Sequence, residues 1–234
     1  VGYKVIKNDP GLLIEQLSSL EEKFLEKDQP ERSDYFYSTR DKYNAQMLEF
    51  DYSSYSNEWI KRAVYLIFLN KTCYNGLFRQ NKKGEFNVPY GKYVNPTICD
   101  AENICAVSAA LENTNIYCAD FTASEKVIDE NSFVYFDPPY RPLNKTSSFT
   151  GYYKEDFEDK DQRKLGLFFH NMDKRGAKLL LSNSDPKNED PADDFFDDLY
   201  SSPKFSIERV QAKRYINCDA TKRGEINELI IYNY

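Results

Sequence analysis

Two segments in the first half of the chain carry apolar residues at the spacing of an amphipathic helix. Residues 10–27 repeat leucine and phenylalanine three and four positions apart, with charged residues between them and a proline at the start. Residues 58–70 repeat this pattern with more apolar positions. The periodicity therefore predicts an amphipathic helix over 10–27 and a buried helix over 58–70.

The pattern changes after the second of these helices. Glycine-containing pairs at 75–76, 83–84 and 90–91 interrupt a polar, basic and aromatic stretch. Such pairs are typical of turns. The stretch is therefore expected to form a loop and a hairpin that present side chains outward.

The second half of the chain alternates short apolar runs with helical patterns. This alternation predicts an α/β protein with a largely parallel, doubly wound, Rossmann-like sheet. The connection at 213–227 is too short for a helical crossover, so the two runs that it joins are expected to pair antiparallel at an edge. We expect strands at 116–119, 133–136, 178–182, 206–212 and 228–232, and helices at 159–174 and 191–200.

Length and charge limit the classes of protein to be considered. The 234 residues, of 27.4 kDa, suffice for one domain or for one domain with a sizeable insert. The formal net charge of −7 argues against a generally basic nucleic-acid-binding protein, so a site for nucleic acid has to be local. Residues 71–97 carry five basic side chains and one acid, whereas residues 189–198 carry six acids and no base.

The cysteine and histidine positions predict no metal site. The five cysteines lack CxxC spacing and a histidine at ligand spacing, so reduced thiols in a cytosolic protein are expected. The single histidine, His170, lies within a helical pattern and is expected to be structural. The sequence contains neither a run of about 18 apolar residues nor a signal-peptide pattern. We therefore expect a cytoplasmic location and no membrane partner. The cysteines are Cys73, Cys99, Cys105, Cys118 and Cys218.

The four residues after the apolar run 133–136 have the composition of a pocket for a planar base with an exocyclic amine. The lone pair of such an amine is delocalised into the ring, so the amine is a weak nucleophile unless hydrogen-bond acceptors draw its geometry toward tetrahedral. The carboxylate of Asp137 and the backbone carbonyl of Pro138 can be these acceptors, because proline fixes the local backbone. Tyr140 offers a ring for stacking, which contributes roughly 1 to 3 kcal/mol for a nucleobase. The amine can then attack an electrophilic methyl group directly.

An Asp-Pro-Pro sequence after a strand can also be an ordinary turn, since both residue types are common there. Its position favours chemistry over a simple turn. In open α/β sheets, ligands bind beyond the carboxyl ends of the strands, and residues 137–140 stand at such an end.

Four blocks of sequence together resemble the Dam-type DNA adenine-N6 methyltransferases. They are YNGLFR at 74–79, GEFNVPYGKY at 84–93, DPPY at 137–140 and FTGY at 149–152. The resemblance runs in order from about residue 58 to the C-terminus. The first two blocks are far more specific than the tetrapeptide alone.

The resemblance implies methyl transfer from S-adenosyl-L-methionine to adenine N6 in double-stranded DNA, usually within GATC. The adenine has to be flipped out, because its amine is paired inside the duplex and the donor cannot approach it in line. Asp137, Pro138, Pro139 and Tyr140 would form the catalytic tetrapeptide, and the loop 141–153 would close over the base. A monomer is expected, with a dimer as the alternative, in a bacterial or phage-infected cell.

By the same resemblance, the basic region at 71–97 would recognise DNA. Arg79 would read a guanine, because a guanidinium offers a fork to O6 and N7. Tyr74 and Asn75 would lie near the flipped base and its orphan partner, whereas lysines would contact phosphates. The other candidate DNA-binding residues are Leu77 and Pro89, for a thymine methyl, Lys92 and Tyr93, for groove or phosphate contacts, and Lys71, Lys82 and Lys83, for phosphates.

The resemblance places the cofactor's adenine at Asp120 and Phe121, where the carboxylate would accept its amino group and the ring would stack. A simple strand-end aspartate is the alternative. Asp137 would lie near the methionine moiety, since donor and acceptor must meet there. In the family, a glycine-rich FxGxG loop, an acidic residue that binds the ribose, and an early Trp and Lys that contact the cofactor precede the tetrapeptide. None of these family positions is matched here, so the first two strands of the sheet are also expected to be missing.

The domain organisation follows from these assignments. We expect a remnant of the catalytic domain at 1–9, a mostly helical target-recognition domain with a hairpin at 10–97, and the catalytic domain at 98–234.

Other classes fit less well. A cytosine-C5 methyltransferase needs a Pro-Cys pair, and none of the ten prolines precedes a cysteine. Cytosine-N4 enzymes share the amine chemistry but more often have serine at the position of Asp137. RNA and protein-glutamine methyltransferases typically have asparagine there and lack the YNGLxR block. A DNA-binding module without catalysis is the alternative from a different class.

Overall fold

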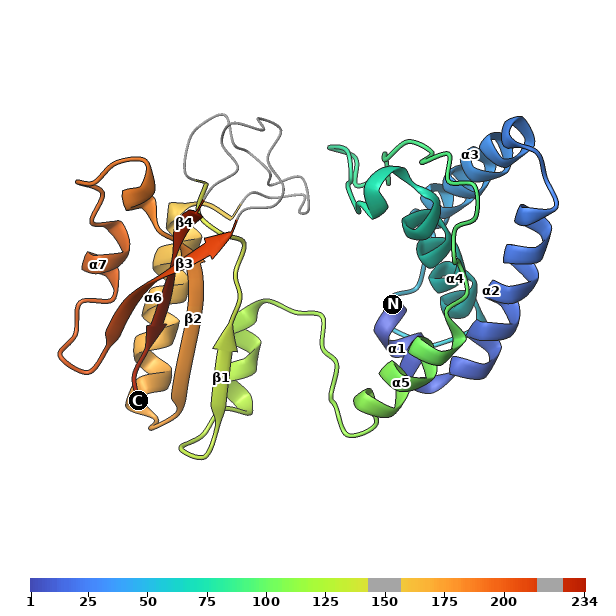
Figure 1. Ribbon diagram of the computed structural model, residues 1–234. Coiled ribbons are helices and arrows are strands. Elements are labelled where there is room, and N and C mark those ends of the chain that lie inside the picture. Colours follow the sequence, from blue (N-terminus) through green and yellow to red (C-terminus); the bar gives the residue numbers. More distant parts are fainter. Residues whose placement is uncertain (143–156, 214–224) are drawn as a thin grey trace. The chain divides into compact units, whose positions relative to one another are not determined.

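The computed structural model describes residues 1–142, 157–213 and 225–234 (Figure 1). These residues form two compact units, Val1–Cys118 and Ala119–Tyr234, called here the helical unit and the sheet unit. The FTGY block at 149–152, most of the loop 141–153 and Cys218 lie outside the described residues.

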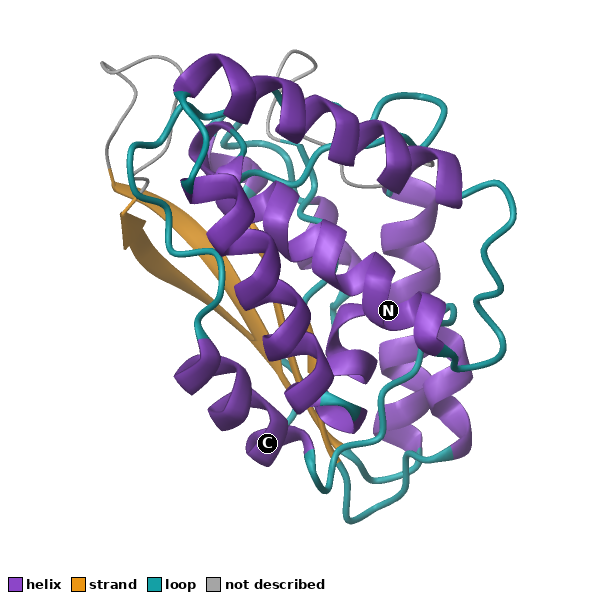
Figure 2. Cartoon of the chain, turned by 90° about the vertical axis from the view of Figure 1, so that its right-hand side faces the viewer, coloured by secondary structure: helices purple, strands orange, loops and turns teal. Residues whose placement is uncertain are grey.

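The helical unit is built around α4, against which the first three helices pack. Its core contains the buried rings of Phe24, Phe36 and Phe68, with Phe24 and Phe68 in edge contact at 5.2 Å between centroids. Figure 2 distinguishes its helices from the strands, which among the described residues all belong to the sheet unit. The elements are α1 (Gly2–Asn8), α2 (Pro10–Leu25), α3 (Gln29–Gln46), α4 (Asn57–Thr72), the 3-10 turn η1 (Tyr74–Gly76) and α5 (Ala101–Leu111).

The two helices expected from periodicity are confirmed as α2 and α4. In α2, the buried side chains are Leu13, Leu17, Leu20 and Phe24, which recur three and four residues apart. Burial of such a stripe on a neighbouring helix is what stabilises a helix of this length in water.

The sheet unit contains a four-stranded sheet in the order β1-β2-β4-β3. β1 and β2 are parallel, whereas β4 is antiparallel to both β2 and β3. The strands are β1 (Phe133–Phe136), β2 (Lys178–Ser184), β3 (Ser206–Lys213) and β4 (Glu225–Tyr232), and the helical elements are η2 (Phe121–Lys126), α6 (Asp159–Lys174), η3 (Pro186–Asn188) and α7 (Phe195–Leu199).

One face of this sheet is covered by α6, which lies along it in Figure 1. Phe136 of β1 contacts the rings of Phe168 and Phe169 on α6, with centroids 6.1 and 5.7 Å apart. Leu179 and Leu181 of β2 are fully buried in the same core. This packing fixes the carboxyl ends of β1 and β2 relative to α6.

The α/β fold class is confirmed, with three corrections to the expected elements. The segment 116–119 forms no strand, because no described strand lies beside it to complete a ladder. Among the described pairings only β1 with β2 is parallel, so the sheet is mixed rather than largely parallel. The helix expected at 191–200 is limited to α7, Phe195–Leu199. The antiparallel pairing of the last two strands is confirmed, with β3 at the edge.

The described residues bear on three further expectations. Cys73, Cys99, Cys105 and Cys118 form no disulfide. His170 is a packed residue whose Nε2 lies 3.1 Å from the Leu199 carbonyl. Within the described ranges, no helix has the length and apolar character needed to cross a bilayer.

Candidate functional site

Asp137 lies directly after β1, with its carboxylate exposed. Phe136 pairs with Leu181 in the parallel ladder, so Ser182, the next residue of β2, lies beside Asp137. The Ser182 hydroxyl lies 3.4 Å from Oδ1 of Asp137 and 2.8 Å from the hydroxyl of Tyr135. Ser182 therefore contacts one carboxylate oxygen of Asp137, while the residue remains exposed to solvent.

The backbone after Asp137 is anchored by buried polar side chains. Nε2 of Gln162 donates to the Pro139 carbonyl at 3.0 Å, and the Arg141 N–H donates to Oδ1 of Asn183 at 2.9 Å. The Ser184 hydroxyl donates to the Arg141 carbonyl at 2.6 Å. The Pro138 carbonyl, by contrast, has no hydrogen-bond partner among the described residues.

The ring of Tyr140 is half-buried at the same end of the sheet. Burial raises the pKa of its phenol, and a hydrogen bond from Ser182 opposes this effect only in part. Tyr140 follows two hydrogen-bond acceptors in the chain, the Asp137 carboxylate and the Pro138 carbonyl, and the raised pKa keeps its phenol protonated even at moderately alkaline pH.

The side chain of Arg141, the residue that follows the tetrapeptide, is held by ion pairs and by an aromatic ring. Its guanidinium forms a two-pronged ion pair with Asp159 at the start of α6, at 2.8 and 3.2 Å, and a second pair with Asp193 at 2.6 Å. It also lies over the ring of Phe195, 4.4 Å from the centroid. The bond with Asp159 is the main cause of the raised pKa of Arg141. These contacts make the side chain a fixed, permanently charged anchor.

Asp120 caps the first turn of η2 rather than ending a strand. Its Oδ1 accepts from the hydroxyl and the N–H of Thr122, at 2.6 and 3.0 Å, and its Oδ2 pairs with Lys164 at 3.0 Å. The Thr122 hydroxyl, followed by Lys164, lowers the pKa of Asp120 to about 2. The carboxylate is thus ionised, and both of its oxygens are already engaged.

The neighbouring Phe121 ring packs edge-on against Phe168 of α6, 5.6 Å away, and the Lys164 ammonium lies 5.1 Å from the ring centroid. A carboxylate next to a half-buried ring suits an adenine, which offers an amino group and a flat face. Lys164 would have to move for the ring to stack. Its side chain and that of Asp120 are both about half exposed (50% and 52%), and such surface pairs are weak.

In the helical unit, the structure brings together Tyr74, Asn75, Pro89 and Tyr93. The Tyr74 N–H donates to the Pro89 carbonyl at 2.9 Å, and the Asn75 N–H donates to the Tyr93 hydroxyl at 3.0 Å. Asn75 has a φ of 56°, a left-handed conformation that asparagine tolerates better than most residues. All four side chains are exposed at this junction.

The hairpin expected after this junction carries Arg79. Isolated bridges pair Cys73 with Tyr90 and Gln80 with Phe86. Arg79 is exposed, and its guanidinium donates to Oδ1 of Asn87 on the opposite arm at 2.9 Å. Of the remaining candidates for DNA contact, Leu77 packs partly into the core, whereas Lys71, Lys82, Lys83 and Lys92 are exposed.

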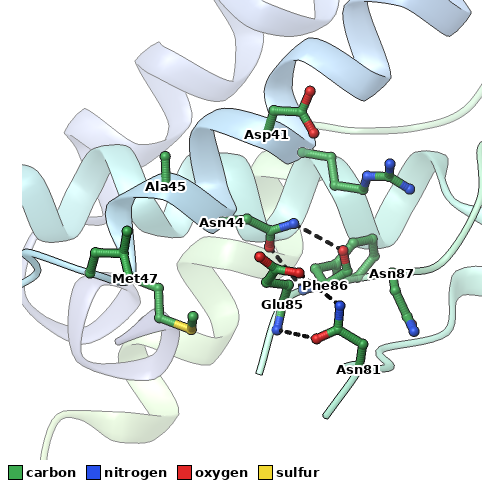
Figure 3. Close-up of a pocket in the computed structure, with 10 residues that line it drawn as sticks. Asp41, Asn44, Ala45, Met47, Asn81, Glu85, Phe86 and Asn87 are labelled. Atoms are coloured by element: carbon green, nitrogen blue, oxygen red, sulfur yellow. Dashed lines mark hydrogen bonds between the residues drawn. The ribbon is translucent and has the colours of Figure 1, made fainter. Parts of the chain in front are cut away.

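A groove of about 400 Å³ separates the C-terminal part of α3 from this hairpin (Figure 3). Asn44 of α3 pairs with the backbone of Phe86 as a neighbouring strand would, accepting its N–H at 2.8 Å and donating to its carbonyl at 3.1 Å. Asn81 closes the turn by donating to Oε2 of Glu85 at 2.7 Å. Asn44 therefore fixes the hairpin to α3.

Sequence reasoning missed the residues that support these candidates, namely Asn44, Gln162 and the polar end of β2 (Ser182, Asn183 and Ser184). One signal could have pointed to the last three: three consecutive polar residues continue the apolar run of β2. Within the described part of the chain, no group of three or more metal-binding side chains is found.

Comparison with known proteins adds information that the geometry lacks. Residues 1–216 match the family described as D12 class N6 adenine-specific DNA methyltransferase. The chain is 52% identical over 233 residues to the Type II methyltransferase M.MjaIII of Methanocaldococcus jannaschii, covering 99% of this chain and 75% of that protein. It is 35% identical over 239 residues to the Type II methyltransferase M1.LlaDCHI of Lactococcus lactis subsp. cremoris, with the same coverage of both. It is 33% identical over 175 residues to the DNA adenine methylase of Escherichia coli K12, covering 75% of this chain and 59% of that protein.

Proposed function

Because the chain belongs to the D12 class of N6 adenine-specific DNA methyltransferases, we propose that it transfers a methyl group from S-adenosyl-L-methionine to adenine N6 within GATC in duplex DNA. Family membership makes the chain an enzyme that methylates adenine in DNA. The proposal adds the donor, the extrusion of the adenine from the duplex and the recognition sequence.

The observation that carries the proposal is the pair of acceptors beyond β1. The Asp137 carboxylate is exposed, and the adjacent Pro138 carbonyl has no partner among the described residues, while the backbone at residues 139 and 141 is bonded to buried side chains. An adenine amine placed here would donate both of its hydrogens, one to each acceptor. Its lone pair would then point away from the ring plane, toward an incoming methyl group.

The target adenine would have to leave the base stack to reach these acceptors. The half-buried, neutral ring of Tyr140 offers a stacking face that offsets part of the lost stacking in DNA. Tyr74 and Asn75 would lie near the flipped base and its orphan partner.

For the donor, we propose that Asp120 and Phe121 hold its adenine and that Asp137 lies near its methionine part. S-adenosyl-L-methionine would supply the electrophilic methyl group. The Asp120 carboxylate, with a pKa of about 2, is ionised at neutral pH, and its Oδ2 can accept an amino hydrogen once Lys164 moves away. Lys164, half exposed, would turn away to open the face of Phe121.

For recognition, we propose that Arg79 reads a guanine, that Leu77 and Pro89 contact a thymine methyl, and that Lys92 and Tyr93 make further groove or phosphate contacts. Lys71, Lys82 and Lys83 would contact phosphates, which position the protein without reading sequence. Their exposure on a locally basic segment of an acidic protein supports this division.

A tritiated-methyl transfer assay tests the proposal. Incorporation is expected with a GATC duplex and not with a duplex whose GATC adenines already carry N6-methyl groups. Duplexes with one base of GATC changed should be poor substrates. Equal incorporation into the premethylated duplex would contradict adenine N6 as the target, and equal incorporation into every changed duplex would contradict GATC.

A further inference from the structure

We propose that Gln162 and Asn183 are positioning residues, a pair of buried amides that hold the loop after Asp137 so that its two acceptors face the substrate. This inference rests on the proposed function of Asp137 and Pro138. It assigns to two residues outside the recognised sequence blocks the task of aiming those acceptors.

The two amides form a continuous chain of hydrogen bonds. Oδ1 of Asn183 accepts from the N–H of Arg141 and from the N–H of Ser184, both at 2.9 Å. Nδ2 of Asn183 donates to Oε1 of Gln162 at 3.2 Å, and Nε2 of Gln162 donates to the Pro139 carbonyl at 3.0 Å. The chain therefore holds the loop at two points, on either side of Tyr140.

Both amides are fully buried, so water cannot replace a lost partner. Each link also has only one workable orientation. If the Gln162 amide turned over, its oxygen would face the Pro139 carbonyl and its nitrogen would face Nδ2 of Asn183, which places like against like at both ends. Residues 139 and 141 are consequently fixed by directional bonds.

The consequence lies one residue earlier. The Pro138 carbonyl belongs to the peptide unit between two prolines, whose φ angles are restricted by their rings. Holding the Pro139 carbonyl and the Arg141 N–H therefore leaves little freedom for the Pro138 carbonyl. Such fixed acceptors need no reorganisation when the amine attacks, which is the condition for electrostatic stabilisation of a transition state.

The chain offers a matched control at the opposite end of β2. Asn233 makes the same kinds of bonds: its Oδ1 accepts the Leu179 N–H at 2.8 Å, and its Nδ2 donates to the Ala177 carbonyl at 2.9 Å. It supports the same strand but contacts none of residues 137–141 in the described structure. Loss of Asn233 should therefore weaken the fold without disturbing the acceptors.

The test compares Gln162→Met, Asn183→Ala and Asn233→Ala with the wild type, at a temperature where all four are folded. The Gln162→Met change would nearly keep the volume of the side chain, but methionine has no group that could donate to the Pro139 carbonyl. We expect single-turnover methylation of a GATC duplex to fall about 10- to 100-fold in the first two variants, the range expected for a misplaced catalytic group. The KM values for DNA and donor should stay within about twofold, and Asn233→Ala should keep the wild-type rate.

A second measurement reads the anchoring without catalysis. Amide hydrogen exchange at Arg141 should become faster in Asn183→Ala but not in Asn233→Ala, because Asn183 alone accepts that N–H. An unchanged single-turnover rate in folded Gln162→Met and Asn183→Ala would overturn the inference, as would an equal loss of rate in Asn233→Ala. Absence of methylation by the wild type would instead contradict the proposed function. Amide hydrogen exchange at Arg141 would then still test whether Asn183 anchors the loop.

Discussion

Arg79 and Asn87, on opposite arms of the hairpin, are joined through one edge of the guanidinium. Nε of Arg79 donates to Oδ1 of Asn87 at 2.9 Å, and Nη2 approaches the Asn87 carbonyl at 3.4 Å. Nη1 has no partner among the described residues. Asn87 therefore holds the guanidinium by its Nε and Nη2 edge and leaves Nη1 available to a ligand.

Arg79→Ala should relax discrimination at one guanine of the recognition sequence by about 1–3 kcal/mol, the usual worth of a two-pronged contact with O6 and N7. Asn87→Ala should produce a smaller loss at the same base, because the guanidinium remains but is no longer oriented. Methylation rates on duplexes changed at one position at a time provide the measurement. An unchanged preference in Arg79→Ala would show that another residue reads the guanine.

Lys82→Ala is the comparison for these two variants. Lys82 is exposed and is proposed to contact a phosphate, so its loss should weaken binding to all duplexes equally. The slope of log affinity against log salt should fall by about one. A sequence-dependent effect of Lys82→Ala would remove the distinction between phosphate and base contacts.

Asp137→Ala should abolish methylation while leaving DNA affinity largely unchanged, because the carboxylate is needed only when the amine attacks. Asp137→Asn keeps one acceptor oxygen but loses the charge, and should retain more activity than Asp137→Ala. Filter binding and methyl-transfer rates on the same duplex separate the two effects. Asp198→Ala, an exposed aspartate elsewhere in the sheet unit, serves as the control and should match the wild type. Strong residual methylation by Asp137→Ala would exclude the proposed role.

Helix α3, which the sequence did not reveal, owes part of its burial to polar residues. In α3, the buried positions are Arg32, Phe36, Thr39 and Tyr43, which have helical spacing but only two rings among them. Arg32 can be buried because its guanidinium donates to the carbonyls of Phe24, at 3.1 Å, and Leu25, at 2.6 Å, at the end of α2. A search for hydrophobic periodicity does not detect such a partly polar stripe.

A capping signal for α3 was nevertheless present in the sequence. Asp28 and Glu31 bond each other's backbone N–H groups at 2.9 and 3.1 Å, the reciprocal arrangement of a capping box. The spacing of these two acids, with a proline between them, could have located the start of the helix.

Residues of the candidate site differ in how far sequence could predict them. The place of Asp137 after a strand followed from a local apolar run, and β1 ends at Phe136 as expected. The roles of Gln162 and Asn183 depend on contacts between segments more than 20 residues apart, which no local pattern encodes. The expected strand at 116–119 failed for a related reason, since a strand needs a partner beside it.

Gly91→Ala should destabilise the helical unit, because a Cβ there would lie 2.7 Å from the Cys73 carbonyl oxygen and 2.6 Å from Cε2 of Tyr93. The two backbone segments cannot separate easily, because the Gly91 N–H donates to the carbonyl of Thr72, the residue before Cys73, at 2.9 Å. We expect a loss of about 1–3 kcal/mol, typical of overpacking. Gly11→Ala in α2 meets nothing within 4 Å and should raise stability by up to about 1 kcal/mol. Urea unfolding of both variants provides the measurement, and equal stability of the two would contradict the close approach at Gly91.

Lys164→Met should raise the pKa of Asp120 from about 2 toward its ordinary value of 3.8, although the bonds from Thr122 should keep it below that value. Because the pKa is lower in the folded state than in the unfolded state, the contribution of Asp120 to stability is fully present above about pH 4 and is lost as the pH falls toward 2. The variant should therefore lose less stability than the wild type over this interval. NMR titration of the Asp120 carboxyl carbon measures the pKa, and acid unfolding measures the stability. Lys160→Met on the same helix removes a lysine that pairs with Glu158 and should leave the pKa of Asp120 unchanged. An unchanged pKa in Lys164→Met would show that Thr122 alone sets the ionisation of Asp120.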